Sequence, residues 1–142
     1  MITLARALEA AIHAEGEKAY PNECCGVLLG TQDAAGVRHV ETLLPIDNAR
    51  ESEEQYHRFR IEADDFIRAE SEARAQGRDV LGFYHSHPDH PALPSEYDRE
   101  YALPFYSYII VSVTKGKAGL LTSWELTLDR SRFVEETIVR EK

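Results

Sequence analysis

The sequence of 142 residues predicts a single α/β domain, in which helices flank a mixed β-sheet. Two observations lead to this fold class. Segments with helical spacing of apolar residues alternate with segments rich in β-formers, as is typical of helices packed on a sheet. The hydrophobic content of 43% provides for a sizeable core, and the length suits one domain over residues 1–142. The sequence has no internal repeat or low-complexity segment.

Four elements are expected in the first half of the chain. Residues 3–19 carry apolar side chains at helical spacing and predict a helix packed on the sheet. Residues 23–30 are almost continuously apolar and predict a mostly buried strand, which pairs with a second strand at residues 37–44. Residues 45–54 are polar and are expected to form a loop, and residues 55–61 could form a third strand.

The second half predicts a helix followed by several strands. Residues 62–76 have acidic side chains early and arginines late, which suits the helix dipole. Residues 79–87 predict a strand, so this helix and strand suggest a β-α-β element. Further strands are expected at residues 105–113 and 120–128, and residues 133–139 predict a last strand or an edge-pairing tail.

Charge and composition limit the partners. The formal net charge of −9 argues against nucleic-acid phosphates and anionic membranes. The N-terminus lacks a signal-peptide pattern, and no apolar run approaches membrane-spanning length, so we expect a soluble cytoplasmic protein. The two cysteines, Cys24 and Cys25, are adjacent, and a vicinal pair seldom forms a structural disulfide. A reducing compartment fits this arrangement.

Two histidines lie at the end of the strand predicted at residues 79–87. Because side chains alternate along a strand, His85 and His87 project from one face and form half of a metal site. Neutral imidazole and carboxylate both suit zinc, and a catalytic zinc takes three protein ligands and leaves a position for water. Asp98 is the nearest good third ligand, and His90 is a rival whose direction between two prolines is hard to predict.

The Ser95-x-x-Asp98 pattern, Glu23 and the two cysteines each have more than one interpretation. Ser95-x-x-Asp98 has the pattern of a capping box that begins a short helix over residues 96–103, which does not exclude a metal role. Glu23 opens an apolar strand, where a carboxylate either caps a nearby group or serves as a general base. A nucleophilic cysteine paired with a histidine is a further alternative, although nothing marks either thiol as activated.

The full motif resembles that of a known family. His-x-His-Pro, six residues and then Ser-x-x-Asp resembles the signature of the JAMM (MPN+) metalloprotease family, which fixes His85, His87, Pro88, Ser95 and Asp98. That family also needs a glutamate on an early strand, and Glu23 lies at the matching place. The resemblance covers residues 3–125 approximately. It implies a strongly curved sheet with zinc at its exposed strand ends.

The resemblance also implies the roles of the site residues. His85, His87 and Asp98 would hold Zn²⁺, and Glu23 would serve as the general base without being a ligand. The Ser95 hydroxyl would help to stabilise the oxyanion formed during amide hydrolysis. By the same resemblance, contacts to the extended tail of the substrate are expected from Asn48, Tyr56, His57, Arg58 and Phe59. Ordinary loop and edge-strand roles are the alternative for these five.

The implied substrate is a ubiquitin-like protein. Family members cleave after a Gly-Gly tail, and small stand-alone members resemble peptidases that release cysteine or a C-terminal extension from a ubiquitin-like sulfur-carrier protein. Few residues separate Asp98 from the next predicted strand, so the insertion of longer members is absent, which favours the sulfur carrier. The alternatives are an isopeptidase that removes conjugated ubiquitin-like modifiers and a non-catalytic MPN-type scaffold. Metal content separates the scaffold from either enzyme.

Two other classes of zinc enzyme are excluded by their motifs. A zinc nucleoside deaminase needs His-x-Glu and Pro-Cys-x-x-Cys, whereas this chain has His-x-His and no Cys-x-x-Cys. A zincin protease needs His-Glu-x-x-His on a helix, which the sequence also lacks.

Overall fold

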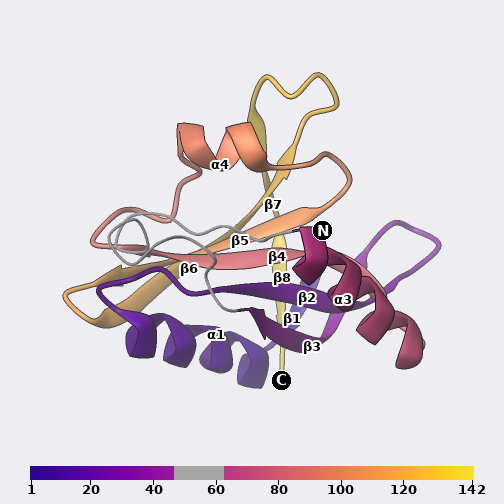
Figure 1. The fold of residues 1–142 in the computed structure, drawn as a ribbon, viewed down its shortest axis with the longest axis horizontal. Helices are drawn as coiled ribbons and strands as arrows, with labels where there is room; N and C mark the ends of the chain where they lie inside the picture. The colour runs from indigo at the N-terminus through magenta and orange to yellow at the C-terminus, as the bar shows by residue number, and fades with distance from the viewer. Residues whose placement is uncertain (47–62) are drawn as a thin grey trace.

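The computed structural model describes residues 1–46 and 63–142, and within these residues eight strands form one mixed sheet (Figure 1). Their order across the sheet is β7-β6-β5-β4-β2-β3-β1-β8. The strands are β1 (Ile2–Ala5), β2 (Cys25–Gln32), β3 (Arg38–Ile46), β4 (Asp79–Pro88), β5 (Ser107–Thr114), β6 (Lys117–Leu126), β7 (Phe133–Glu136) and β8 (Ile138–Glu141). The described helices are α1 (Arg6–Ala19), α3 (Ala63–Ala75) and α4 (Glu96–Tyr101).

The sheet is nearly closed on itself. Its two edge strands, β7 and β8, are consecutive in the chain and are separated only by Thr137. A single residue cannot cross an open sheet of eight strands, so the sheet must curve until its edges approach each other. The backbone N–H of Ile2 on β1 donates to the Thr137 carbonyl at 3.0 Å, which ties the junction to β1. The expectation of a mixed, strongly curved sheet flanked by helices is therefore confirmed.

Both faces of the central strands are buried, which explains their nearly continuous apolar sequence. Leu28 of β2 and Tyr84 of β4 pack in the cluster that includes Ile12 of α1. Their neighbours Val27 and Phe83 pack in a second cluster that includes Ala69 and Ala73 of α3. Helix α1 therefore covers one face and α3 covers the other, as alternation along a strand requires.

The predicted pairings around α3 are confirmed. β2 pairs antiparallel with β3 on one side and with β4 on the other, so β3 and β4 run in the same direction. Helix α3 lies between them in the chain and completes the predicted β-α-β element. β4 and β5 then pair in parallel, and α4 lies in the connection between them. Among the described residues, no helix has the length and apolar character needed to cross a membrane.

Several predicted boundaries were wrong. Residues 3–5 belong to β1 rather than to the first helix, because they pair with β3 and with the distant β8. Pro45 and Ile46 extend β3 instead of beginning a loop. The strand predicted at residues 120–128 is β6, which begins earlier at Lys117, and residues 133–139 are divided at Thr137 into β7 and β8. The strand expected at residues 55–61 lies outside the described residues.

Candidate metal centre

His85 and His87 lie on one face of β4 close to its end at Pro88. Their Nε2 atoms are 3.1 Å apart, and both side chains are buried. The alternation of side chains along the strand accounts for this approach, because residues two apart project from the same face. The pair predicted from the His-x-His spacing is therefore formed by the fold.

Asp98 comes to this pair from the first turn of α4. Its Oδ1 is 3.3 Å from His85 Nε2, and its Oδ2 is 3.2 Å from His87 Nε2. The predicted capping box is confirmed: Asp98 N donates to Ser95 Oγ at 3.0 Å, and Ser95 N donates to Asp98 Oδ2 at 2.8 Å. One carboxylate thus caps the helix and faces both imidazoles, so the capping role does not exclude a metal role.

Glu23 lies two residues before the start of strand β2 and approaches the two histidines from there. The Cys24 N–H donates to Ser86 Oγ at 2.8 Å, and the Ser86 N–H donates to the Cys24 carbonyl at 3.1 Å. These bonds continue the β2–β4 pairing of Cys25 with His85 and bring Glu23 level with His87. One carboxylate oxygen of Glu23 and one ring nitrogen of each histidine all lie within 4.8 Å of one another.

The electrostatics of the cluster favour a neutral His85 and an ionised Asp98. Burial lowers the pKa of His85, and this outweighs the attraction of Asp98 for its proton. Burial acts to raise the pKa of Asp98, but the neighbouring His85 and His87 outweigh it and hold that pKa well below its usual range. Neutral imidazole and carboxylate are the forms that bind a metal ion.

The donor set fits a zinc ion. His87 Nδ1 is 2.8 Å from the Pro91 carbonyl, which can only accept, so Nδ1 carries the hydrogen. With Nδ1 protonated in the neutral ring, Nε2 directs a lone pair at Asp98 Oδ2, and a metal ion held by both atoms would satisfy this arrangement. Ligand atoms about 2.1 Å from a tetrahedral zinc lie about 3.4 Å from one another. The two Nε2 atoms are 3.1 Å apart, and each lies a similar distance from one oxygen of Asp98, 3.3 Å to Oδ1 for His85 and 3.2 Å to Oδ2 for His87.

Two sets of atoms compete for the third ligand position. One ligand atom each from Glu23, His85 and His87 lie within 4.8 Å of one another, and Asp98 has Oδ1 3.3 Å from His85 Nε2 and Oδ2 3.2 Å from His87 Nε2. Asp98 is also held by the capping box, which keeps its carboxylate facing the two imidazoles. His90, the rival named from the sequence, is exposed.

The structure gives no support to a cysteine nucleophile. Cys24 and Cys25 are both buried. Burial raises the pKa of Cys24 to about 11 and raises that of Cys25 still further. A thiol with so high a pKa has almost no thiolate near neutral pH.

The tail contacts inferred by resemblance cannot be placed. Asn48, Tyr56, His57, Arg58 and Phe59 lie outside the described residues.

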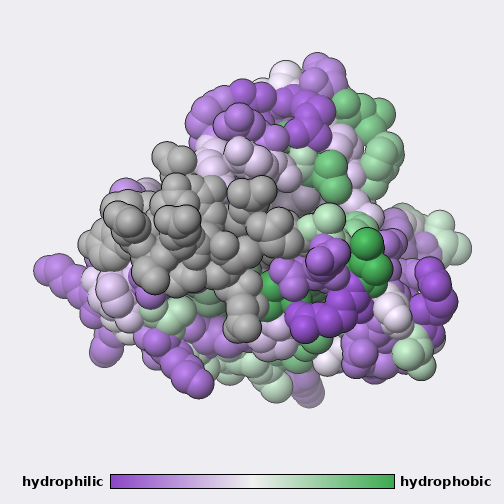
Figure 2. Space-filling view, viewed as in Figure 1, coloured by the Kyte–Doolittle hydropathy of each residue, from purple (hydrophilic) through white to green (hydrophobic). Residues whose placement is uncertain are grey.

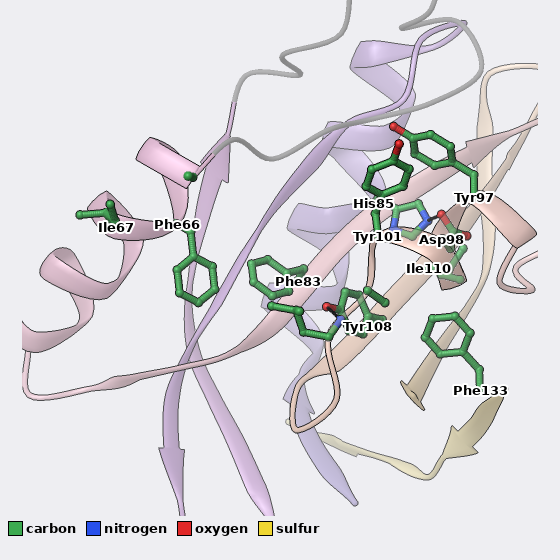
Figure 3. A pocket seen from close by; sticks show the side chains of 13 residues that line it. Phe66, Ile67, Phe83, His85, Tyr97, Asp98, Tyr101, Tyr108, Ile110 and Phe133 are labelled. Carbon is green, nitrogen blue, oxygen red and sulfur yellow. Dashed lines mark hydrogen bonds and ion pairs between the residues drawn. The ribbon is translucent and has the colours of Figure 1, made fainter. Parts of the chain in front are cut away.

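A pocket beside the metal site was missed from the sequence (Figure 3). Its volume is about 550 Å³, and His85 and Asp98 are among the residues that line it. The other lining side chains are mostly aromatic or aliphatic and come from α3, β4, α4, β5 and β7. One signal was present in the sequence: Phe83 precedes His85 by two residues and therefore lies on the same face of the strand.

A curved mixed sheet with histidines at the end of one strand and a carboxylate from the next helix defines a domain of the JAB/MPN class. The chain belongs to the Prok-JAB family, described as prokaryotic homologs of the JAB domain, and matches it over residues 5–127.

Individual relatives agree with this family. The chain is 35% identical over 113 residues to a protein named desampylase from Haloferax volcanii, covering 79% of this chain and 75% of the relative. A solution structure from Desulfitobacterium hafniense is 33% identical with a TM-score of 0.86, and the match covers 100% of this chain and 94% of that one. A solution structure from Salinibacter ruber is 45% identical with a TM-score of 0.77, covering 99% and 92%.

A more distant structure shares the fold. A JAB1/MPN domain protein from Archaeoglobus fulgidus is 21% identical with a TM-score of 0.57, and the match covers 98% of this chain and 97% of that one.

Proposed function

We propose that this protein is a zinc-dependent metallopeptidase of the JAMM type. Its substrate is a ubiquitin-like sulfur-carrier protein, and it hydrolyses the amide bond after the C-terminal Gly-Gly to release cysteine or a C-terminal extension. The observation that carries the proposal is the convergence of His85, His87 and Asp98, with separations of 3.1–3.3 Å, next to the carboxylate of Glu23. Membership of the Prok-JAB family and the relative named desampylase support a hydrolase acting on a ubiquitin-like protein.

The residues that would hold zinc are His85, His87 and Asp98. When bound there, zinc would supply Lewis acidity, which lowers the pKa of a water molecule toward ~7 and polarises a carbonyl oxygen. The Pro91 carbonyl fixes the tautomer of His87, and the Ser95 N–H fixes the orientation of Asp98. Such outer contacts hold the ligand atoms in place and tune their basicity.

Glu23 is the proton carrier in this proposal. Its carboxylate has an oxygen within 4.8 Å of a ring nitrogen of each histidine. It takes a proton from the attacking water and returns it to the nitrogen of the leaving amine. The two hydrogen bonds between Cys24 and Ser86, one of them to the Ser86 hydroxyl, hold the Glu23 segment against β4 while the proton moves.

Ser95 can stabilise the developing negative charge on the amide oxygen. Its Oγ accepts the Asp98 N–H at 3.0 Å, which leaves the hydroxyl hydrogen for donation to another oxygen. The side chain is exposed at the helix start, where a substrate could reach it. A donor of this kind typically contributes about 2.7–4 kcal/mol to stabilising the transition state.

Two alternatives differ in substrate or in activity. Removal of a conjugated ubiquitin-like modifier is favoured by the name of the Haloferax volcanii relative. The sulfur carrier is favoured by the short connection between α4, which ends at Tyr101, and β5, which begins at Ser107. A non-catalytic scaffold is disfavoured because the donor set and Glu23 lie together in the fold.

Two variants separate the metal from the base. We expect Glu23→Gln to keep one zinc per chain and to lose nearly all turnover of a Gly-Gly-extended carrier, because the amide cannot accept the proton. We expect His85→Ala to lose zinc. Glu100→Gln, an exposed position on α4, is the matched control and should behave as the wild type. Full turnover by Glu23→Gln would refute the base assignment, and absence of zinc from the wild type would favour the scaffold.

A further inference from the structure

The pocket beside the metal site has the character of a side-chain binding site. Its volume of about 550 Å³ lies within the ordinary range for ligand pockets. Phe66 and Phe83 pack with ring centroids 5.8 Å apart, and Phe83 and Tyr108 pack at 5.5 Å. The Tyr108 hydroxyl already accepts the Leu103 N–H at 2.8 Å, so its polar end is occupied. These contacts leave a wall that favours an apolar occupant.

Three apolar or aromatic side chains that line the pocket are well exposed to solvent. Ile67 of α3 is 63% exposed, Tyr101 of α4 is 61% exposed and Leu103 is 46% exposed. Figure 2 shows hydrophobic residues around a hollow between the parts of the surface formed by α4 and α3. His85 and Asp98 are the charged or basic residues among the described lining, and both lie where the pocket meets the metal site. The pocket is therefore continuous with the candidate active site.

Under the proposed function, the pocket would lie on the acyl side of the bond to be cleaved. Phe83, His85 and His87 follow one another on one face of β4. Glu23 is level with His87, whereas the pocket floor at Phe83 lies in the opposite direction from His85. Because Glu23 gives a proton to the leaving amine, the leaving group lies toward Glu23. The acyl part of the substrate must then extend toward Phe83.

The distance along the strand fits a Gly-Gly spacer. Two residues of extended chain span about 6.6 Å, which is the separation of Phe83 from His85 along β4. Two glycines of an extended substrate span the same distance from the scissile carbonyl. Glycine has no side chain to meet His85 or Asp98, and the next residue upstream arrives above the aromatic floor.

We propose that this pocket binds the side chain that immediately precedes the Gly-Gly of the substrate, and that it selects an apolar one. The inference rests on the proposed function and adds a specificity determinant to it. The rim residue Ile67 is a specificity-determining position, because a charge there would lie at the mouth of the apolar pocket.

Binding of uncleavable product peptides tests the pocket without requiring turnover. Peptides of equal length ending in Phe-Gly-Gly, Leu-Gly-Gly or Asp-Gly-Gly would be titrated into the zinc-loaded wild-type protein by calorimetry. We expect the first two to bind roughly 10- to 100-fold more tightly than the third. Equal affinities within twofold would overturn the inference.

A charge at the rim tests the position of the site. Ile67→Lys should remove most of the preference for the Phe and Leu peptides over the Asp peptide. Leu120→Lys is the matched control, because Leu120 is 67% exposed on β6 and does not line the pocket. Loss of the preference in both variants, or in neither, would contradict the assignment.

Turnover separates failure of the pocket from failure of the proposed function. Carriers with the same three residues before Gly-Gly would be compared by kcat/KM. Cleavage of all three at equal rates would overturn the pocket and leave the function standing. Selective peptide binding without cleavage of any carrier would support the pocket and overturn the proposed reaction.

Discussion

Loss of the Ser86 hydroxyl should shift Glu23 relative to the zinc ligands without moving the ligands themselves. Ser86 is fully buried, and its Oγ accepts the Cys24 N–H at 2.8 Å on the residue next to Glu23. It lies between His85 and His87, so its side chain projects from the face opposite to the imidazoles. Ser86→Ala therefore removes a contact of the Glu23 segment while leaving the zinc ligands unchanged.

The magnitude follows from the amide that Ser86→Ala leaves behind. A buried N–H without its acceptor costs about 1–3 kcal/mol, so the free energy of unfolding should fall by that amount. For a chain of this size, the fall corresponds to a decrease of about 3–10 °C in Tm. A displacement of Glu23 by about 1 Å can cost up to 10²-fold in rate, and we expect kcat to fall at least tenfold. KM should stay near the wild-type value because the pocket is untouched.

Urea unfolding, zinc content and steady-state kinetics on a Gly-Gly-extended carrier would measure these effects. Ser123→Ala is the matched control, since Ser123 is equally buried and its Oγ donates to Glu136 at 2.9 Å, away from the site. It should lose comparable stability and keep its kcat. Wild-type kcat in a destabilised Ser86→Ala protein would refute the role of Ser86 in positioning Glu23. Unchanged stability would refute the energetic argument.

Three further predictions test other parts of the site. Ser95→Ala should lower kcat by about 10²–10³-fold through loss of the oxyanion donor, and it should also cost about 0.5–2 kcal/mol of stability through loss of the helix cap, as kinetics and thermal unfolding would show. Iodoacetamide at pH 8 should leave native activity intact, because with a pKa of about 11 roughly one Cys24 thiol in a thousand is ionised; rapid modification with loss of activity would contradict this. A chelator should lower the Tm of the zinc-loaded protein by removing a stabilising ligand and should leave the Tm of His87→Ala unchanged.

The parts of the site that depend on local spacing could be predicted from the sequence. The alternation of a strand places His85 and His87 together, and a four-residue capping box orients Asp98. These arrangements depend on residues within fourteen positions of one another, counting from His85 to Asp98, so local rules suffice. The role of Glu23 needed the resemblance, because nothing local to Pro21–Cys25 shows that β2 pairs with β4.

Features made by distant segments could not be predicted in this way. Local spacing predicts helix for residues 3–5, whereas their strand β1 depends on pairing with β8 at the other end of the chain. A buried network also escaped detection: Arg38 donates to Ser107 Oγ at 2.8 Å and contacts Glu136 Oε2 at 3.4 Å. The pocket combines side chains from five elements, and only the packing of the whole sheet brings them together.

The most direct test of the proposed reaction is the intact mass of a ubiquitin-like sulfur-carrier protein that carries a cysteine or a short peptide after Gly-Gly. It would be incubated with the zinc-loaded protein and, in parallel, with a chelator-treated sample. We predict that the carrier loses the mass of its extension after Gly-Gly in the first sample and keeps it in the second. An unchanged mass with one zinc bound per chain would contradict the assignment of this substrate.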